Sequence, residues 1–197
     1  QVSLNGVDVS VPTFADYIER YRNNTDDETP SKPLVFHNLN SRWRIGLGLS
    51  ESGSLDAVSF VNGIATSRGG THVNVILQQL TKKIQERVKK LDPELATVVS
   101  QGLIRRNLFI AVDALIENPT FDSQMKEYLT SNPDSFGSSY KVPESFYREL
   151  FRPESEGGPG VVEEILRVAL GRQQATLAKE VGGRKTRRQL LSIPKLE

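Results

Sequence analysis

The sequence predicts an α+β domain in which helices back a β-sheet, and three observations indicate this class. Apolar residues alternate strictly between Trp43 and Leu49, which is the pattern of a half-buried strand. From Thr71 the apolar spacing changes to that of an amphipathic helix. Residues 107–118 form a near-continuous apolar stretch that suits a central strand covered on both faces. With 197 residues the chain is long enough for one well-buried core.

The first 22 residues are predicted to form a hairpin and then a helix. Valine and leucine residues flank a turn at Asn5-Gly6, a pair that favours two-residue hairpins. Aromatic residues and Ile18 follow at helical spacing, and Thr13 can cap this helix. Residues 23–32 carry no apolar side chain, so they cannot bury surface, and we expect a mobile loop there.

Three strand signals come next, at residues 33–38, 43–49 and 55–62. A turn at Gly53 separates the last two, and the succession predicts an antiparallel meander. The helix that starts at Thr71 places its apolar residues on one face, and a proline ends it.

The last part of the chain is predicted to be helical in two places. Residues 143–151 read as a short helix, and a break rich in glycine precedes a longer helix from about Val161 to Val181. Gly182-Gly183 is expected to stop the longer helix. The basic tail beyond it has little with which to pack, so we expect it to lie against a part that is absent from this chain.

The composition argues against several classes of protein. The 25 Lys and Arg nearly balance the 24 Asp and Glu, so any nucleic-acid contact must come from local basic patches. With no cysteine and two histidines, we expect neither disulfides nor a zinc site. No apolar run approaches the roughly twenty residues that a membrane-spanning helix needs. The chain starts with Gln1 and its single methionine is Met125, so we expect a segment of a longer polypeptide.

Gln124 and Lys126 offer an amide and an ammonium on a predicted turn after the central strand. Two such donors can hold a phosphate, and an ammonium on a flexible stem can follow the phosphate as a site opens and closes. From the residues alone, an ordinary solvated lysine is the simpler interpretation of Lys126. The surrounding residues 115–126 are what favour the phosphate role.

The glycine pair before the second predicted helix has two interpretations as well. Gly69-Gly70 could present backbone amides to an anion at the helix start. A structural role is the better interpretation, in which the glycines allow a sharp entry, Thr71 caps the helix and His72 makes a local hydrogen bond.

Two stretches of the chain resemble the eukaryotic type IIA DNA topoisomerases. Residues 59–74 read SFVNGIATSRGGTHVN, which is similar to the transducer signature of that family. Residues 115–126 read LIENPTFDSQMK, which is similar to the loop that reaches from the transducer domain into the neighbouring ATPase domain. That loop carries Gln-Thr-Lys in the family, and here Met125 replaces the threonine. Both stretches occur in the family's order and at about its spacing.

The resemblance implies an α+β transducer domain with a ribosomal-protein-like mixed or antiparallel sheet, helices behind it and a long C-terminal helix. It implies that residues 1–22 end the ATPase domain, that residues 23–181 form the transducer domain, and that residues 182–197 form a basic linker toward a TOPRIM domain that this chain lacks. In the intact enzyme, one DNA duplex is cut and a second is passed through it.

The resemblance also implies the site and the partners. Lys126 and Gln124 would contact the terminal phosphate of ATP bound in the ATPase domain, and Mg²⁺ would act in the intact enzyme without binding this segment. The partners implied are double-stranded DNA, a second subunit in a homodimer, and the ATPase and TOPRIM domains of the same chain, with no membrane. The location implied is the nucleus, with an organelle as the alternative.

Candidate DNA contacts are basic residues on the second helix, before the central strand and in the tail. Each can equally be a solvated surface residue. The tail is the more promising group, because it is similar to the basic pattern that precedes a Pro-Lys-Leu-Glu run in the family. The candidates are Lys82, Lys83, Arg87, Lys89 and Lys90, then Arg105 and Arg106, and in the tail Arg184, Lys185, Arg187 and Arg188.

No catalytic residue is predicted. The chain has no glycine-rich Walker loop and no counterpart of the family's ATPase glutamate, TOPRIM acidic residues or DNA-cleaving tyrosine. We therefore expect this segment to be inert alone. Its tyrosines read as packing residues, namely Tyr17, Tyr21, Tyr128, Tyr140 and Tyr147.

Two alternatives to the topoisomerase interpretation remain open. A nucleic-acid-binding module of similar fold, without nucleotide sensing, predicts strong and steeply salt-dependent binding, whereas the net charge of +1 argues for weak binding. A structural adaptor predicts that Gln124 and Lys126 are dispensable.

Overall fold

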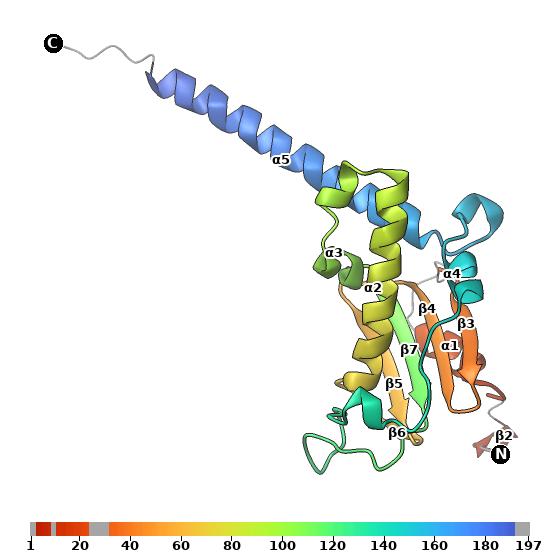
Figure 1. Ribbon diagram of the computed structural model, residues 1–197. Coiled ribbons are helices and arrows are strands. Elements are labelled where there is room, and N and C mark those ends of the chain that lie inside the picture. Colours follow the sequence, from red (N-terminus) through yellow and green to blue (C-terminus); the bar gives the residue numbers. More distant parts are fainter. Residues whose placement is uncertain (1–2, 9–10, 24–31, 192–197) are drawn as a thin grey trace.

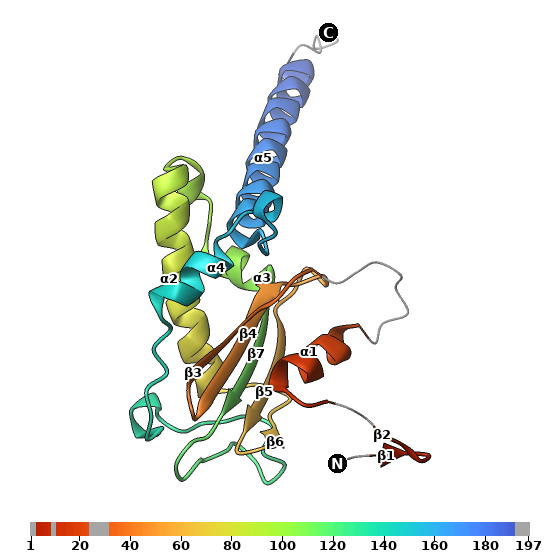
Figure 2. The same cartoon turned by 90° about the vertical axis from the view of Figure 1, so that its right-hand side faces the viewer.

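In the computed structural model, which describes residues 3–8, 11–23 and 32–191, five strands form one mixed sheet with helices on both faces (Figures 1 and 2). The predicted α+β class is therefore confirmed. The sheet has the order β3-β4-β7-β5-β6. Its strands are β3 (Val35–Asn40), β4 (Trp43–Leu49), β5 (Asp56–Val61), β6 (Ile64–Ala65) and β7 (Leu108–Ala114).

Among the described residues, five helices accompany the sheet, three short 3-10 turns lie in the connections after the second helix, and a separate two-stranded hairpin precedes the first helix. The hairpin comprises β1 (Ser3–Leu4) and β2 (Val7–Asp8). The helices are α1 (Phe14–Arg22), α2 (Thr71–Leu91), α3 (Gln101–Arg106), α4 (Glu144–Leu150) and α5 (Val161–Leu191). The 3-10 turns are Leu95–Thr97, Pro133–Ser135 and Glu154–Glu156.

The predicted antiparallel meander is wrong at its third strand. β3 and β4 pair antiparallel as expected, but β7 lies between β4 and β5, antiparallel to the first and parallel to the second. Every residue of β7 is buried, so this strand takes the centre, where both faces are covered. The parallel pairing of β5 with β7 requires a crossover connection, and α2 provides it.

One face of the sheet carries the main core, and α2 covers it. Ile76, Leu80 and Ile84 of this helix are fully buried in one cluster with the apolar side chains of β4 and β7. α1 covers part of the opposite face, where Ile18 packs against Phe109 and Ala111 of β7 (Figure 2). The apolar stripe predicted for α2 is therefore confirmed.

The predicted N-terminal elements are also confirmed. Asn5 and Gly6 take the left-handed conformations of the predicted turn. The Thr13 side chain accepts from the Asp16 N–H, and the Asp16 carboxylate accepts in return from the Thr13 N–H, which forms a capping box. Most of the segment in which we expected a mobile loop, residues 24–31, lies outside the described part of the chain.

The tyrosines fulfil the predicted packing role unequally. The rings of Tyr140 and Tyr147 lie against other aromatic rings of the core, whereas Tyr21 on α1 is 57% exposed. The ring of Tyr17, also on α1, contacts Phe60 edge-on but remains 42% exposed. The packing prediction is therefore wrong for Tyr21, because α1 turns that side chain toward solvent.

α5 does not stop at Gly182-Gly183, so the predicted helix end is wrong. The helix continues through both glycines to Leu191 and extends away from the body of the molecule (Figure 1). Each glycine costs about 1 kcal/mol relative to alanine inside a helix, and the arginine, lysine, glutamine and leucine residues beyond are strong helix formers. In the described part of the chain, no helix is apolar enough over a sufficient length to cross a bilayer.

Candidate functional site

The predicted phosphate-contacting residues lie on the long connection that follows β7. This connection runs past the start of α2 at the end of the sheet opposite to α5 (Figures 1 and 2). Gln124 and Lys126 are both exposed, and Met125 between them is 77% exposed. The three side chains are therefore accessible to a neighbouring domain or ligand.

Backbone hydrogen bonds close the neck of this loop. Phe121 and Leu129 form an antiparallel bridge, and the Asp122 N–H donates to the Tyr128 carbonyl at 3.1 Å. One residue farther from the tip of the loop, the Thr130 N–H donates to the Thr120 carbonyl at 2.9 Å. The segment between is thus a short loop with a fixed base rather than a free strand.

The base of the loop is bonded directly to the start of α2. The Leu129 N–H donates to the Gly69 carbonyl at 3.1 Å, and the Thr71 N–H donates to the Leu129 carbonyl at 3.0 Å. Gly70 has a φ of 145°, and a Cβ there would lie 2.5 Å from the Leu129 nitrogen. Only glycine fits this crossing. The two stretches that carry the family resemblance are also in direct contact, because the Asn62 Nδ2 donates to the Ile116 carbonyl at 2.9 Å.

The structure supports the structural interpretation of the glycine pair but corrects the role of Thr71. Gly70 is the N-cap residue and Thr71 is the first helical residue, so its hydroxyl cannot cap the helix. Within the described residues that buried hydroxyl has no hydrogen-bond partner. The Thr71 amide already donates to Leu129, so it is not free to bind an anion.

His72 is fully buried beneath the same connection. One ring nitrogen, Nε2, lies 3.3 Å from the Thr66 hydroxyl, which in turn lies 2.6 Å from the Ser59 hydroxyl. The predicted local hydrogen bond is thus present. Burial lowers the pKa of His72 to about 4, so the ring is neutral at pH 7.

Lys126 adopts a left-handed backbone conformation with φ of 59°, and its N–H donates to the Ser123 carbonyl at 3.1 Å. Its Nζ lies 6.0 Å from the centre of the Phe121 ring. Among the residues that the structure describes, no carboxylate pairs with this ammonium. Its positive charge is therefore available to an external anion.

Sequence reasoning missed one residue of the site, Arg68. Its N–H donates to the Glu127 carbonyl at 3.0 Å, and its Nη1 donates to Asp122 Oδ2 at 2.7 Å. The position directly before the glycine pair was the available signal. Periodicity could not show the partner, because Asp122 lies 54 residues further along the chain.

The basic residues of α2 are not equivalent. Lys83 pairs with Glu144 of α4, which raises the pKa of the lysine, and its Nζ lies 5.3 Å from the centre of the Tyr147 ring. Burial raises the pKa of that Tyr147 hydroxyl to about 12. Lys83 therefore belongs to the α2–α4 contact. The exposed basic residues of the helix are Lys82, Arg87, Lys89 and Lys90.

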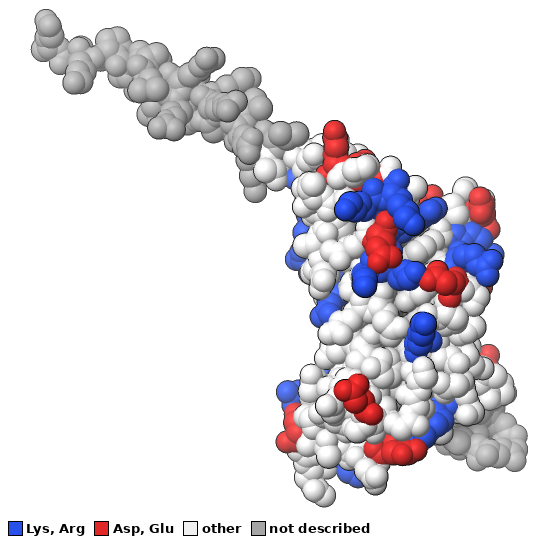
Figure 3. All heavy atoms as spheres, in the orientation of Figure 1, with Lys and Arg blue, Asp and Glu red and all other residues white. Residues whose placement is uncertain are grey.

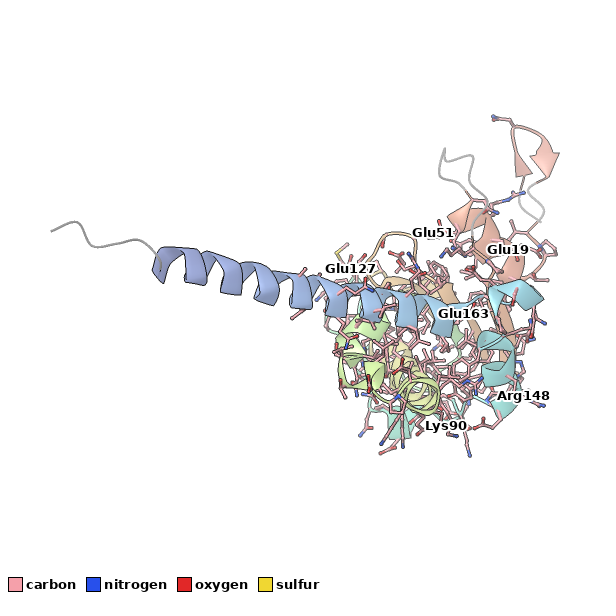
Figure 4. All side chains as sticks on the ribbon, turned by 90° about the horizontal axis from the view of Figure 1, so that it is seen from above. Glu19, Glu51, Lys90, Glu127, Arg148 and Glu163 are labelled. Carbon is pink, nitrogen blue, oxygen red and sulfur yellow. The ribbon has the colours of Figure 1, made fainter. Side chains whose placement is uncertain are left out.

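These exposed cations form a mixed surface. Lys and Arg gather over the C-terminal part of α2 with acidic side chains among them (Figure 3). Lys90 and Arg148 lie on the same side of the molecule, on α2 and α4 respectively (Figure 4). Arg106 of α3, a helix that sequence reasoning missed, donates from Nε to the Gly102 carbonyl at 3.3 Å, whereas the Nε of Arg105 is buried without a partner among the described residues.

The tail candidates have a described backbone and no described side chains. Arg184, Lys185, Arg187 and Arg188 all lie on α5. Their part in DNA contact stays a prediction.

Across the described residues, no group of three or more His, Asp or Glu side chains could hold a metal ion.

Comparisons with known proteins agree with this architecture. A family model described as DNA gyrase B matches residues 13–183. DNA topoisomerase 2-alpha of Homo sapiens is 38% identical over 198 residues, which cover 100% of this chain and 12% of the human protein. The mitochondrial DNA topoisomerase 2 of Dictyostelium discoideum is 34% identical over 206 residues, covering 100% of this chain and 15% of its own.

A crystal structure of the ATPase and transducer domains of DNA topoisomerase II from Balamuthia mandrillaris superposes with a TM-score of 0.71. Its sequence is 40% identical, and the match covers 82% of this chain and 37% of that one. The chain thus spans a small part of the relatives that it matches. It belongs to the DNA gyrase B family, and within that family it is related to the eukaryotic type II DNA topoisomerases.

Proposed function

We propose that this chain is the transducer segment of an ATP-dependent type II DNA topoisomerase, which relays ATP binding and hydrolysis to the DNA gate during double-strand passage. The observation that carries the proposal is the exposed ammonium of Lys126 on a loop whose base is bonded to the start of α2. Residues 1–22 would end the ATPase domain, residues 23–181 would form the transducer domain, and residues 182–197 would lead toward the TOPRIM domain.

In this proposal Lys126 and Gln124 contact the terminal phosphate of ATP that the ATPase domain holds. A phosphate that draws the loop toward itself must also displace Leu129, and through Leu129 the start of α2. α2 packs against α5 at the other end of the body, so the helix pair offers a path for the displacement (Figure 1). ATP can bias the arrangement only by the difference between its contacts in the two states.

The cofactors and partners follow from the same proposal. ATP is bound mainly by the ATPase domain and contacted from here through the loop, and Mg²⁺ acts in the intact enzyme without binding this segment. Double-stranded DNA meets the exposed cations of α2 and the basic part of α5. The complete enzyme acts as a homodimer. The cellular location is the nucleus, with an organelle as the alternative that the mitochondrial relative supports.

The proposal is tested by Lys126→Ala in the longer protein that contains the ATPase domain. A hydrogen bond between charged groups contributes about 1.5 to 3 kcal/mol, so kcat/KM for ATP should fall about tenfold or more. Lys126→Arg should restore little, because a planar guanidinium does not reproduce a compact ammonium. Steady-state ATPase rates measure both effects.

The matched control is Met125→Thr, which changes the neighbouring exposed side chain and should leave the rate close to that of the unaltered protein. The 197-residue chain alone should hydrolyse no ATP. An adaptor without a nucleotide function requires Lys126→Ala to have no effect, and that result would reject the proposal.

A further inference from the structure

Arg68 bonds to both flanks of the segment that carries Gln124 and Lys126. Its Nη1 donates to Asp122 Oδ2 at 2.7 Å, two residues before Gln124. Its backbone N–H donates to the Glu127 carbonyl at 3.0 Å, directly after Lys126. One residue in the β6–α2 connection thus holds the beginning and the end of the loop.

Arg68 contacts residues that adjoin Phe121, the aromatic ring over which the Lys126 ammonium lies. Asp122, the partner of Arg68, follows Phe121, whose ring centre lies 6.0 Å from the Lys126 Nζ. The Arg68 guanidinium carbon also lies 5.9 Å from the centre of the Tyr128 ring, and the Tyr128 carbonyl accepts from the Asp122 N–H. A change at Arg68 therefore reaches Lys126 through its immediate neighbours.

The exposure of this ion pair indicates that its role is orientation rather than global stability. The Arg68 side chain is 61% exposed and the Asp122 side chain is 27% exposed. Ion pairs with such access to water add little to the free energy of unfolding, because solvent screens them. Lys126, however, holds a left-handed backbone conformation that a lysine adopts only when its surroundings impose it.

We propose that Arg68 is a positioning residue for Lys126, which sets where the ammonium stands and thereby the affinity of the loop for the terminal phosphate of a nucleotide. This rests on the proposed function. Arginine suits the role because its fork can bond to Asp122 while its planar face lies near the Tyr128 ring.

The positioning itself is tested on the 197-residue chain, without nucleotide, by amide hydrogen exchange. Arg68→Ala should speed exchange of the Asp122 and Lys126 amides about tenfold, while the amides of β7 and the denaturation midpoint stay unchanged. Arg20→Ala, which removes an exposed arginine from α1, is the matched control and should change none of these. Loop amides that exchange at the unaltered rate in Arg68→Ala would overturn the proposal.

Two further variants keep this test decisive. Arg68→Lys retains the cation opposite Asp122, so it should recover part of the protection that alanine removes, whereas both variants keep the backbone bond to Glu127. If Arg68→Ala does not fold, Asp122→Asn weakens the same ion pair from the loop side and should loosen the same amides. Asp122→Asn with full protection of the Lys126 amide would equally overturn the proposal.

The consequence for the nucleotide is tested by a double-variant cycle in the longer protein with its ATPase domain. Arg68→Ala should raise the KM for ATP about fivefold to tenfold, and the double variant Arg68→Ala/Lys126→Ala should be no worse than Lys126→Ala alone, because Arg68 acts through Lys126. Independent, multiplicative effects would overturn the positioning role. A Lys126→Ala variant without any effect would instead reject the proposed function, and the hydrogen-exchange result would then decide on Arg68 by itself.

Discussion

Gly70 is a residue at which the start of α2 and the base of the loop cross in direct backbone contact. Its backbone forms a parallel bridge with Leu129, and a side chain there would meet the backbone of that residue. The close packing of the loop against the start of α2 therefore requires a residue without a Cβ atom at position 70.

Gly70→Ala should destabilise the chain on the order of 3 kcal/mol, because the new Cβ meets the Leu129 backbone and alanine must adopt a φ of 145°. Chemical denaturation measures the loss. Gly102→Ala is the control, since its Cβ would have its nearest neighbour 3.9 Å away, at the Ser100 hydroxyl. That change in a helix should stabilise by up to about 1 kcal/mol. Equal midpoints for the two variants would show that the crossing at Gly70 tolerates a side chain.

His72 should make the stability of the fold depend on pH. Burial lowers its pKa to about 4 from an ordinary value of 6.5, so between these values the unfolded chain binds the extra proton. The free energy of unfolding should fall as the pH drops from 6.5 to about 4, by up to about 1.4 kcal/mol per pH unit from this group. Denaturation curves recorded across this window should show that the free energy of unfolding of His72→Gln changes less with pH than that of the unaltered chain. An identical dependence on pH in both proteins would assign the effect to other groups.

At this scale the sequence indicated the roles of some residues and not of others. The glycine pair predicted a sharp entry into the helix, because glycine can adopt the backbone conformations that such an entry needs. The resemblance to the topoisomerases indicated the role of Lys126. The expectation that Thr71 caps α2 failed because a hydroxyl before a helix looks the same whether it occupies the cap or the first turn. Arg68 was missed because its two partners are distant in sequence.

At the scale of elements, periodicity predicted strands and helices better than it predicted their neighbours. The near-continuous apolar run of β7, which only Asp113 interrupts, predicted a central strand, and β7 is the central strand. The same pattern carries no information about which strands lie beside it, so β5 was assigned to β4 rather than to β7. α3, at 6 residues, was too short to show a helical period.

The helix α2 should contact DNA through its exposed cations if the proposed function is right. Replacing Lys82, Lys89 and Lys90 with alanine in the longer protein should weaken binding to double-stranded DNA. The slope of log affinity against log salt should fall by about 0.9 for each phosphate that the variant no longer neutralises. Lys83→Ala is the control, because Lys83 is already paired with Glu144 and should leave the slope unchanged. A titration in which the triple variant keeps the original slope would assign these lysines to a solvated surface.

The same titration examines the basic part of α5. A lowered slope after the change would support a DNA contact there, and an unchanged slope would assign the cluster to packing or to solvent. The variant replaces four residues with alanine, namely Arg184, Lys185, Arg187 and Arg188.

At the scale of the whole molecule, the loop with Lys126 and the projecting helix α5 lie at opposite ends of the body (Figure 1). α2 spans the distance between them, since its first residues bond to the loop side and it packs against α5 farther along. The sequence indicated that both ends exist but not that one helix joins them. That connection depends on the hydrogen bonds at Leu129, which no periodicity reveals.

The most direct test of the account compares strand passage with DNA cleavage in the full-length enzyme that carries Lys126→Ala. If the loop senses the terminal phosphate, ATP-dependent strand passage should fall about tenfold or more, on the scale of one charged hydrogen bond. ATP-independent DNA cleavage, which the proposed function assigns to residues outside this chain, should stay at the level of the unaltered enzyme. Strand passage at the unaltered rate, measured at subsaturating ATP, would contradict the central claim that Lys126 couples the nucleotide to the DNA gate.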